Sequence, residues 1–411
     1  MPENSGKGSL QISVTSDEGF IPISGATITI TFTGNPDSIF ESVTTDNSGQ
    51  TETIEVPAPP IEYSQTPSAE QPYSEYNVTV TAPGFETAVV SGTQVLPDRI
   101  ALQPIALHPT ERGTAGGAVA IDPHTLYGDY PPKIPEAEIK PMDESGEIVL
   151  SQVVIPEYVV VHDGPPTDTA AKDYYVLYRD YIKNVASSEI YATWPESTIY
   201  ANILAIMSFT LNRVYTEWYT GKGYSFTITS STAYDQKFLY GRNIYSNIDR
   251  MVDSVFANYL SRPGVKQPIF TSYCDGNRTQ CAGLSQWGSK ALGDQGYSAI
   301  DIIHNYYGND MYINAAEKVA GVPSSWPGYN LQEGSSGESV KTAQHQLNRI
   351  ADNYPAIPKL AEDGAYGPLT AEAVKTFQKI FGLPQTGTID YATWYKISHI
   401  YTAVARLAVL R

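Results

Sequence analysis

Apolar and polar residues alternate along the first hundred residues, a period typical of half-buried β-strands. Clear examples are centred on Ile12, Ile30 and Val78. Residues that favour turns separate the runs, as in Asp46-Asn-Ser-Gly49 and Pro83-Gly84. Short strands at this rhythm predict a β-sandwich over residues 1–108.

Three phrases of this region carry a resemblance. They are Gly25-Ala-Thr-Ile-Thr-Ile, Thr44-Thr-Asp-Asn-Ser-Gly-Gln and Val80-Thr-Ala-Pro-Gly-Phe-Glu. They resemble carboxypeptidase regulatory-like, transthyretin-like modules, which implies a spacer, docking or inhibitory domain.

The period becomes helical between residues 177 and 215. Apolar positions of the two predicted helices are Leu177, Tyr181, Ile182 and Val185, then Ile199, Ile203, Ile206 and Val214. Thr193 and Glu196 are spaced as a capping box for the second helix, with Pro195 in its first turn. Glu189 falls in the short apolar connection between them. A carboxyl group in such a place is partly dehydrated, which favours its protonated form.

Mixed elements fill the rest of residues 153–322. We expect a β-rich run at 153–161, a strand and loop at 226–235, and a helix at 248–260. A further helix opens at Ser298 and runs to Tyr306. The pattern predicts a mixed α/β domain, and the whole chain a multidomain α+β protein.

Three helices are predicted within residues 323–411. Their markers are Val340, Ala343, Leu347 and Ile350, then Ala373, Val374, Phe377 and Phe381, then Trp394. The words Gly337-Glu-Ser-Val-Lys, Asp363-Gly-Ala-Tyr-Gly-Pro and Ala373-Val-Lys-Thr-Phe-Gln resemble the three-helix peptidoglycan-binding module. That resemblance implies peptidoglycan as a partner.

Residues 109–152 lack sustained periodicity. They contain Gly113-Thr-Ala-Gly-Gly, Pro131-Pro-Lys-Ile-Pro and the acidic run Asp143-Glu-Ser-Gly-Glu. Proline-rich backbone followed by an acidic segment predicts an exposed linker, where proteases cut.

The formal charge of −18 over 411 residues is uneven. Residues 1–108 hold 13 acids and 2 bases, residues 109–152 hold 8 and 3, and residues 153–411 hold 23 and 21. Without a basic stripe, nucleic acid is an unexpected partner. No apolar run is long enough to span a membrane, and the N-terminus lacks a signal-peptide pattern. Cys274 and Cys281 are expected to be free or bridged thiols rather than part of a zinc site.

Two motifs in the central region carry a further resemblance. The first consists of Tyr181, Ile182, Val185, Glu189, Trp194 and Pro195. The second consists of Gly283, Ser285, Gln286, Gly288, Ala291, Leu292, Gln295, Gly296, Tyr306 and Tyr307. Both resemble stage II sporulation protein D and its relatives, which are lytic transglycosylases of peptidoglycan. Two departures are Gln280, where the family has His, and Met207, where an Arg is common.

This resemblance implies that Glu189 is the catalytic acid and then base of a lytic transglycosylase. A single carboxyl group suffices because its two roles are successive, whereas an ordinary glycosidase needs two. Residues expected to hold sugar are Tyr234, Asp235, Ser285, Gln286 and Trp287. Asp275 is the candidate second carboxylate, and its placement opposite Glu189 would favour a hydrolytic muramidase.

The domain arrangement resembles the spore cortex-lytic enzymes of anaerobic spore formers. It implies a proenzyme that a subtilisin-like protease activates at germination, in the spore cortex or coat region outside the inner membrane. Cutting near residue 152 would leave a formal charge of −2 and reduce repulsion from an anionic wall. No cofactor or metal is expected. Two alternatives stay open: an inactive wall-binding protein, or an amidase that uses His162.

Overall fold

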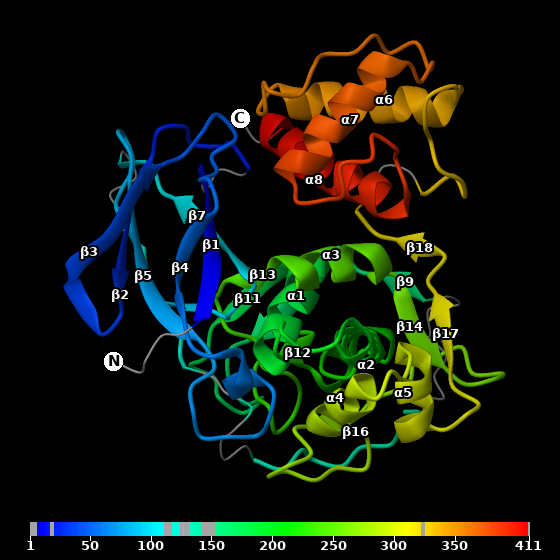
Figure 1. The fold of residues 1–411 in the computed structure, drawn as a ribbon. Helices are drawn as coiled ribbons and strands as arrows, with labels where there is room; N and C mark the ends of the chain where they lie inside the picture. Colours follow the sequence, from blue (N-terminus) through cyan, green and yellow to red (C-terminus); the bar gives the residue numbers. More distant parts are fainter. Residues whose placement is uncertain are drawn as a thin grey trace.

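A computed structural model describes residues 6–16, 20–110, 117–123, 126, 131–140, 153–321 and 325–409. It has a β-rich N-terminal part, a central part built around one long helix, and a helical C-terminal part (Figure 1). The predicted multidomain α+β organisation is confirmed. The supposed cleavage position near residue 152 lies outside the described residues.

The N-terminal part contains two sheets. Its elements are β1 (Gly6–Ser16), β2 (Thr27–Phe32), β3 (Asn35–Thr44), β4 (Ile54–Ala58), η1 (Ile61–Ser64), β5 (Ser74–Thr81), β6 (Ala88–Val95), β7 (Ile100–Leu107) and β8 (Ala118–Ala120). One sheet has the order β13-β7-β1-β4 and the other β3-β2-β5-β6-β8. Side chains alternate between buried and exposed along β1 and β5, as the sequence period requires.

Two strands of these sheets come from outside residues 1–108. Strand β8 pairs in parallel with β6, so the second sheet extends into the segment predicted as linker. Strand β13 (Ile244–Tyr245) belongs to the central part and pairs antiparallel with β7, with Ile244 opposite Leu102. The N-terminal and central parts are therefore joined by backbone hydrogen bonds (Figure 1).

The central part encloses helix α2. Its helices are α1 (Tyr178–Glu189), α2 (Glu196–Tyr215), α3 (Ser246–Val255), α4 (Gln286–Asp294) and α5 (Ala299–Tyr307), with the 3-10 helix η3 (Thr220–Lys222). Its other strands are β9 (Val154–Ile155), β10 (Tyr158–His162), β11 (Asp173–Leu177), β12 (Ile228–Thr229), β14 (Asn258–Ser261), β15 (Tyr273–Cys274), β16 (Leu284–Ser285), β17 (Tyr312–Ala315) and β18 (Lys318–Val319). Helix α2 is buried on nearly every side, which explains its apolar sequence.

Two local predictions were wrong. The helix expected over residues 248–260 ends at Val255, and Tyr259 lies in β14, paired with β17. The capping box at the start of α2 does not form, because Pro195 is the N-cap and makes no side-chain cap bond. The hydroxyl of Thr193 bonds instead to the hydroxyl of Ser64, 2.7 Å away in the N-terminal part.

The C-terminal part consists of α6 (Glu338–Ala351), α7 (Pro368–Ile380) and α8 (Tyr391–Val409), as predicted. Helix α8 docks on α3 through a buried ion network. Asp253, fully buried on α3, lies 2.9 Å from Lys396 of α8, 2.9 Å from Lys183 and 3.2 Å from Arg179. Burial opposes ionisation, but these cations outweigh it and lower the pKa of Asp253 below its ordinary value.

Residues 131–140, within the segment predicted as linker, are anchored to the central part, although six of the ten are exposed. This segment, which we call the strap, runs in extended form along the central part. The backbone N–H of Ile134 donates to Ala233 at 2.9 Å, and the carbonyl of Glu138 accepts from Phe270 at 2.8 Å. Near its end, the N–H of Lys140 donates to the side chain of Gln267 at 2.8 Å. The sequence does not reveal these contacts, because a proline-rich segment is typical of a linker without fixed partners.

Candidate functional site

Glu189 is the last residue of α1, and its side chain is only 7% exposed. Its Oε1 accepts a hydrogen bond from the backbone N–H of Lys237 at 2.7 Å and a long one from the hydroxyl of Tyr273 at 3.4 Å. Its Oε2 accepts from the amide of Gln286 at 3.0 Å. Three separate segments therefore fix the orientation of one carboxyl group.

Glu189 lines a small pocket. The other lining residues are Leu126, Pro131, Lys133, Thr232, Tyr273, Cys274, Asp275, Thr279 and Gln286. Its free volume is about 40 Å³, which holds a few water molecules. The strap supplies Pro131 and Lys133, so the front of the chain forms part of the pocket wall.

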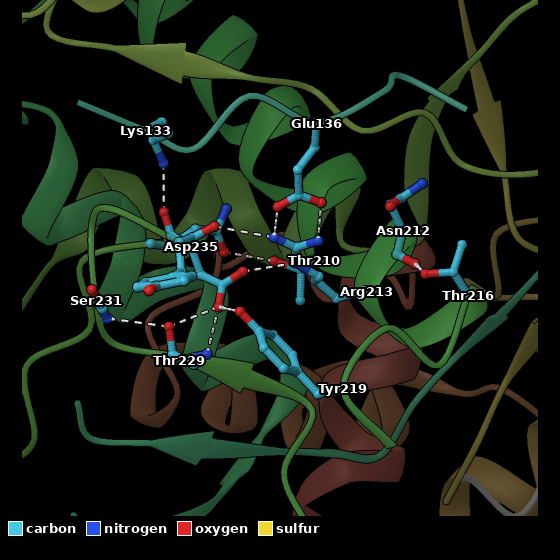
Figure 2. A network of polar contacts seen from close by, with 12 residues as sticks. Lys133, Glu136, Thr210, Asn212, Arg213, Thr216, Tyr219, Thr229, Ser231 and Asp235 are labelled. Carbon is cyan, nitrogen blue, oxygen red and sulfur yellow. Dashed lines mark hydrogen bonds and ion pairs between the residues drawn. The ribbon is translucent and has the colours of Figure 1, made fainter. Parts of the chain in front are cut away.

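Lys133 brings a positive charge to the pocket. Its ammonium group donates to the carbonyl oxygen of Asp235 (Figure 2). The same group lies 4.4 Å from the ring centre of Tyr273. Burial lowers the pKa of Lys133, and the carboxylates of Glu189 and Asp235 partly offset that lowering. The attraction to Glu189 helps to hold the strap over the pocket.

A second anchor of the strap is Glu136. Its two carboxylate oxygens accept a pair of bonds from Arg213 of α2, both at 2.7 Å (Figure 2). It also lies 2.6 Å from Lys140. Burial lowers the pKa of Lys140 to about 8, against the opposing effect of Glu136. These paired charges leave the strap with few unsatisfied groups.

Asp235 is placed differently from the sugar-binding role predicted for it. Its side chain is fully buried and 2.7 Å from Nε of Arg213. Its other oxygen accepts from Tyr219, and from the hydroxyl and N–H of Thr229, at 2.7 to 2.9 Å (Figure 2). Asp235 therefore stabilises the packing of Arg213, Tyr219 and Thr229 beside the pocket. Tyr234, its half-buried neighbour, is outside the pocket lining and offers its carbonyl to Arg213.

The loop from Cys274 to Cys281 forms one wall. These two residues form a disulfide, so the thiols are bridged. Asp275 lines the pocket with Glu189, but its carboxylate accepts backbone N–H groups of Asn277, Arg278 and Thr279 at 2.8 to 3.3 Å. Asp275 therefore shapes its own loop, and its role as a second carboxylate stays a prediction.

The start of α4 contains the other predicted residues. Ser285 is the N-cap, and its hydroxyl accepts from Gly288 at 2.9 Å. Gln286 contacts Glu189 directly. Trp287 is 9% exposed, and its ring centre lies 4.9 Å from that of Trp194. A Cβ on Gly283 would lie 1.6 Å from the carbonyl oxygen of Ser272, so this position requires glycine.

Sequence reasoning missed Lys133, Tyr273 and the N–H of Lys237. Tyr273 directly precedes Cys274, but nothing local shows that its hydroxyl points to Glu189. The N–H of Lys237 is a backbone group, and every residue except proline has one, so the residue type cannot reveal this bond. Lys133 carried one available signal, since it is a lone cation in an otherwise apolar Pro-rich run.

His162, the amidase candidate, has its Nδ1 2.7 Å from Asp173 and its ring stacked on Phe226 at 4.4 Å. In the described part of the chain, no three His, Cys, Asp or Glu side chains gather as metal ligands. Across the same residues, no helix is both long and apolar enough to cross a membrane.

Residues 336–397 match the family described as "Putative peptidoglycan binding domain". The chain therefore has a peptidoglycan-binding domain at its C-terminal end. Over 74 residues it is 45% identical to the zinc D-Ala-D-Ala carboxypeptidase of Streptomyces albus G, a match that covers 18% of this chain. The chain spans about a quarter (27%) of the length of that curated relative.

A solved structure described as "The Bacillus anthracis TIE protein" is similar at 16% identity. The match covers 25% of this chain and 17% of that one, with a TM-score of 0.19. This likeness is too weak to show a shared fold.

Proposed function

We propose that this chain is a lytic transglycosylase that cleaves peptidoglycan glycan strands, with Glu189 as its acid and base. The observation that carries the proposal is the buried carboxyl group of Glu189, oriented by Gln286, Lys237 and Tyr273 in a pocket. The peptidoglycan-binding domain supplies the means to stay on the polymer. The resemblance of two central motifs to the sporulation protein D family supports the same chemistry.

The proton balance needs only one carboxyl group. Protonated Glu189 donates to the glycosidic oxygen while the bond from muramic C1 to that oxygen breaks. The resulting carboxylate takes the proton of the C6 hydroxyl, and O6 bonds to C1. No water is consumed, and the product has a 1,6-anhydro-muramic end.

We further propose that the chain is made as a proenzyme. The strap supports this, because it lines one side of the pocket and places the ammonium of Lys133 near a carboxyl group that must carry a proton in the first step. A cut after the strap would let both leave with the N-terminal part. The overall arrangement supports action on spore cortex at germination, outside the inner membrane, after cleavage by a subtilisin-like protease.

A hydrolytic muramidase is the second candidate, because Asp275 lines the same pocket. Product analysis separates the two. Isolated cortex glycan is digested with the full chain, before and after treatment with a subtilisin-like protease, and the ends are identified by mass spectrometry. Glu189→Gln is the test variant, and Glu196→Gln, exposed in the first turn of α2, is its matched control.

We expect anhydro-muramic ends from the cut parent and the cut Glu196→Gln control, and none from Glu189→Gln. Reducing muramic ends would favour the hydrolase. Absence of any product from the cut parent would contradict both and favour a wall-binding protein. New free amino termini without new sugar ends would favour an amidase.

A further inference from the structure

The stretch 191–194, just after Glu189, is covered by residues from the front of the chain. The backbone N–H of Leu126 donates to the hydroxyl of Tyr191 at 2.9 Å. Nε of Arg99 donates to the carbonyl of Ala192 at 2.7 Å. Arg99 and Leu126 both precede the cut proposed near residue 152.

The next two residues are covered in the same way. The hydroxyls of Thr193 and Ser64 lie 2.7 Å apart, and Nε1 of Trp194 donates to the carbonyl of Ser64 at 2.8 Å. Ser64 ends the 3-10 helix η1 and is fully buried against the central part. Four consecutive residues of the central part therefore give their polar groups to the N-terminal part.

These residues also form an aromatic cluster. The ring centres of Tyr191, Trp194 and Trp287 lie 4.9 to 6.0 Å from one another. Nε1 of Trp287 is buried and has no hydrogen-bond partner among the described residues. Flat apolar faces edged by hydroxyl and N–H groups suit a pyranose ring, whose own faces are apolar and whose rim is polar.

The cluster is continuous with the Glu189 pocket. Leu126, which donates to Tyr191, also lines that pocket. Trp287 directly follows Gln286, whose amide holds Glu189. A sugar on the cluster would thus belong to the same glycan strand as the bond near Glu189.

We propose that Tyr191, Thr193, Trp194 and Trp287 form a sugar subsite beside the acid, which Ser64, Arg99 and Leu126 cover until the N-terminal part leaves. Sugar hydroxyl and N-acetyl groups both donate and accept hydrogen bonds. In the cut chain they take the place of Leu126 as the partner of Tyr191, and of Ser64 as the partner of Thr193 and Trp194. This inference rests on the proposed glycan-cleaving function and assigns its neighbouring subsite.

The test uses the full chain after proteolytic cutting and soluble glycan oligomers of the alternating N-acetylglucosamine and N-acetylmuramic acid repeat. Tyr191→Phe and Thr193→Val each remove one hydroxyl and keep the shape of the side chain. Thr216→Val is the matched control, because its hydroxyl bonds only within its own region, to the carbonyl of Asn212. Trp287→Phe, with Trp326→Phe as control, removes the unpaired N–H.

We expect KM to rise roughly threefold to tenfold for each test variant with kcat nearly unchanged, as the loss of one substrate hydrogen bond predicts. The controls keep the parent values. An active parent whose test variants keep its KM would overturn the subsite. A lower melting temperature of the uncut variants, with an unchanged KM after cutting, would mean that 191–194 is only a docking surface, and would also overturn it. A cut parent that makes no new sugar ends would refute the proposed function instead.

Discussion

The amide of Gln286 donates to Oε2 of Glu189 at 3.0 Å, although 97 positions separate the two residues. Gln286 is the first residue of α4, and the cap by Ser285 fixes where that helix begins. The other oxygen of Glu189 accepts from the backbone of Lys237. The direction in which the acid points therefore depends on where α4 starts.

Replacement of Gln286 tests this dependence. Gln286→Leu keeps the size of the side chain but removes the donor, so the carboxyl group of Glu189 loses one of its fixed partners. We expect kcat of the cut chain to fall by about tenfold to a hundredfold, with a smaller change in KM. Gln295→Leu, at the exposed C-cap of the same helix, is the control. Equal rates for Gln286→Leu and the parent would mean that the amide does not position the acid.

The sequence predicted those elements whose period is long and local. Helix α2 and the first two C-terminal helices were predicted because their apolar spacing repeats over several turns. The capping box failed because Thr193 bonds to Ser64, a partner 129 positions away. The strap was predicted to be a linker because its partners are also far away in the sequence, as Arg213 is from Glu136. Local pattern carries no information on such pairs.

The candidate site shows the same limit. The motif resemblance supplied Glu189 and Gln286, which the structure brings into contact. Asp235, predicted separately to hold sugar, is instead enclosed with Arg213 of α2, because a buried cation needs a buried partner. Lys133 was missed because its significance depends on the position of Glu189, which a Pro-rich run cannot indicate.

Reversing the charge of Lys133 tests whether the strap holds the site closed. Lys133→Glu places a carboxylate near Glu189 and Asp235, and like charges in a buried place are strongly unfavourable. We expect the uncut variant to release glycan products at least about tenfold faster than the uncut parent, because a loosened strap exposes the acid. Product release per hour is the measurement.

Lys266→Glu makes the same charge change at an exposed position and is the control. After cutting, both variants should match the parent, since the strap then leaves with the N-terminal part. The uncut Lys133→Glu chain could instead release products as slowly as the uncut parent while its cut form is fully active. That result would show that the strap does not block the site.

Gly283 provides a stability test of the disulfide-closed wall. In Gly283→Ala the new methyl would lie 1.6 Å from the carbonyl oxygen of Ser272, a backbone atom that cannot rotate away. We expect a loss of about 2–4 kcal/mol in the free energy of unfolding, as for other overpacked or strained positions. Gly221→Ala, where a Cβ meets nothing within 4 Å, is the control. Thermal melting followed by circular dichroism measures both, and equal melting temperatures would contradict the steric argument.

Acid should weaken the joint between the central part and the peptidoglycan-binding domain. The pKa of Asp253 in the folded chain lies below its ordinary value of 3.8, because Lys183, Lys396 and Arg179 overcome the effect of burial. A carboxyl group of this kind stabilises the folded state above pH 3.8, and that contribution is lost as the pH falls toward the lower folded value. The free energy of unfolding should therefore decrease as the pH drops below about 4. Asp253→Asn leaves buried Arg179 and half-buried Lys396 without this anion, while Lys183 keeps only Asp249, and should cost about 3–5 kcal/mol at pH 7. Its stability should then depend less on pH between 4 and 3 than that of the parent, whereas the exposed Asp37→Asn control should follow the parent. Melting curves at pH 7, 4 and 3 for the three chains measure this, and an Asp253→Asn curve that falls in parallel with the parent would locate the acid sensitivity elsewhere.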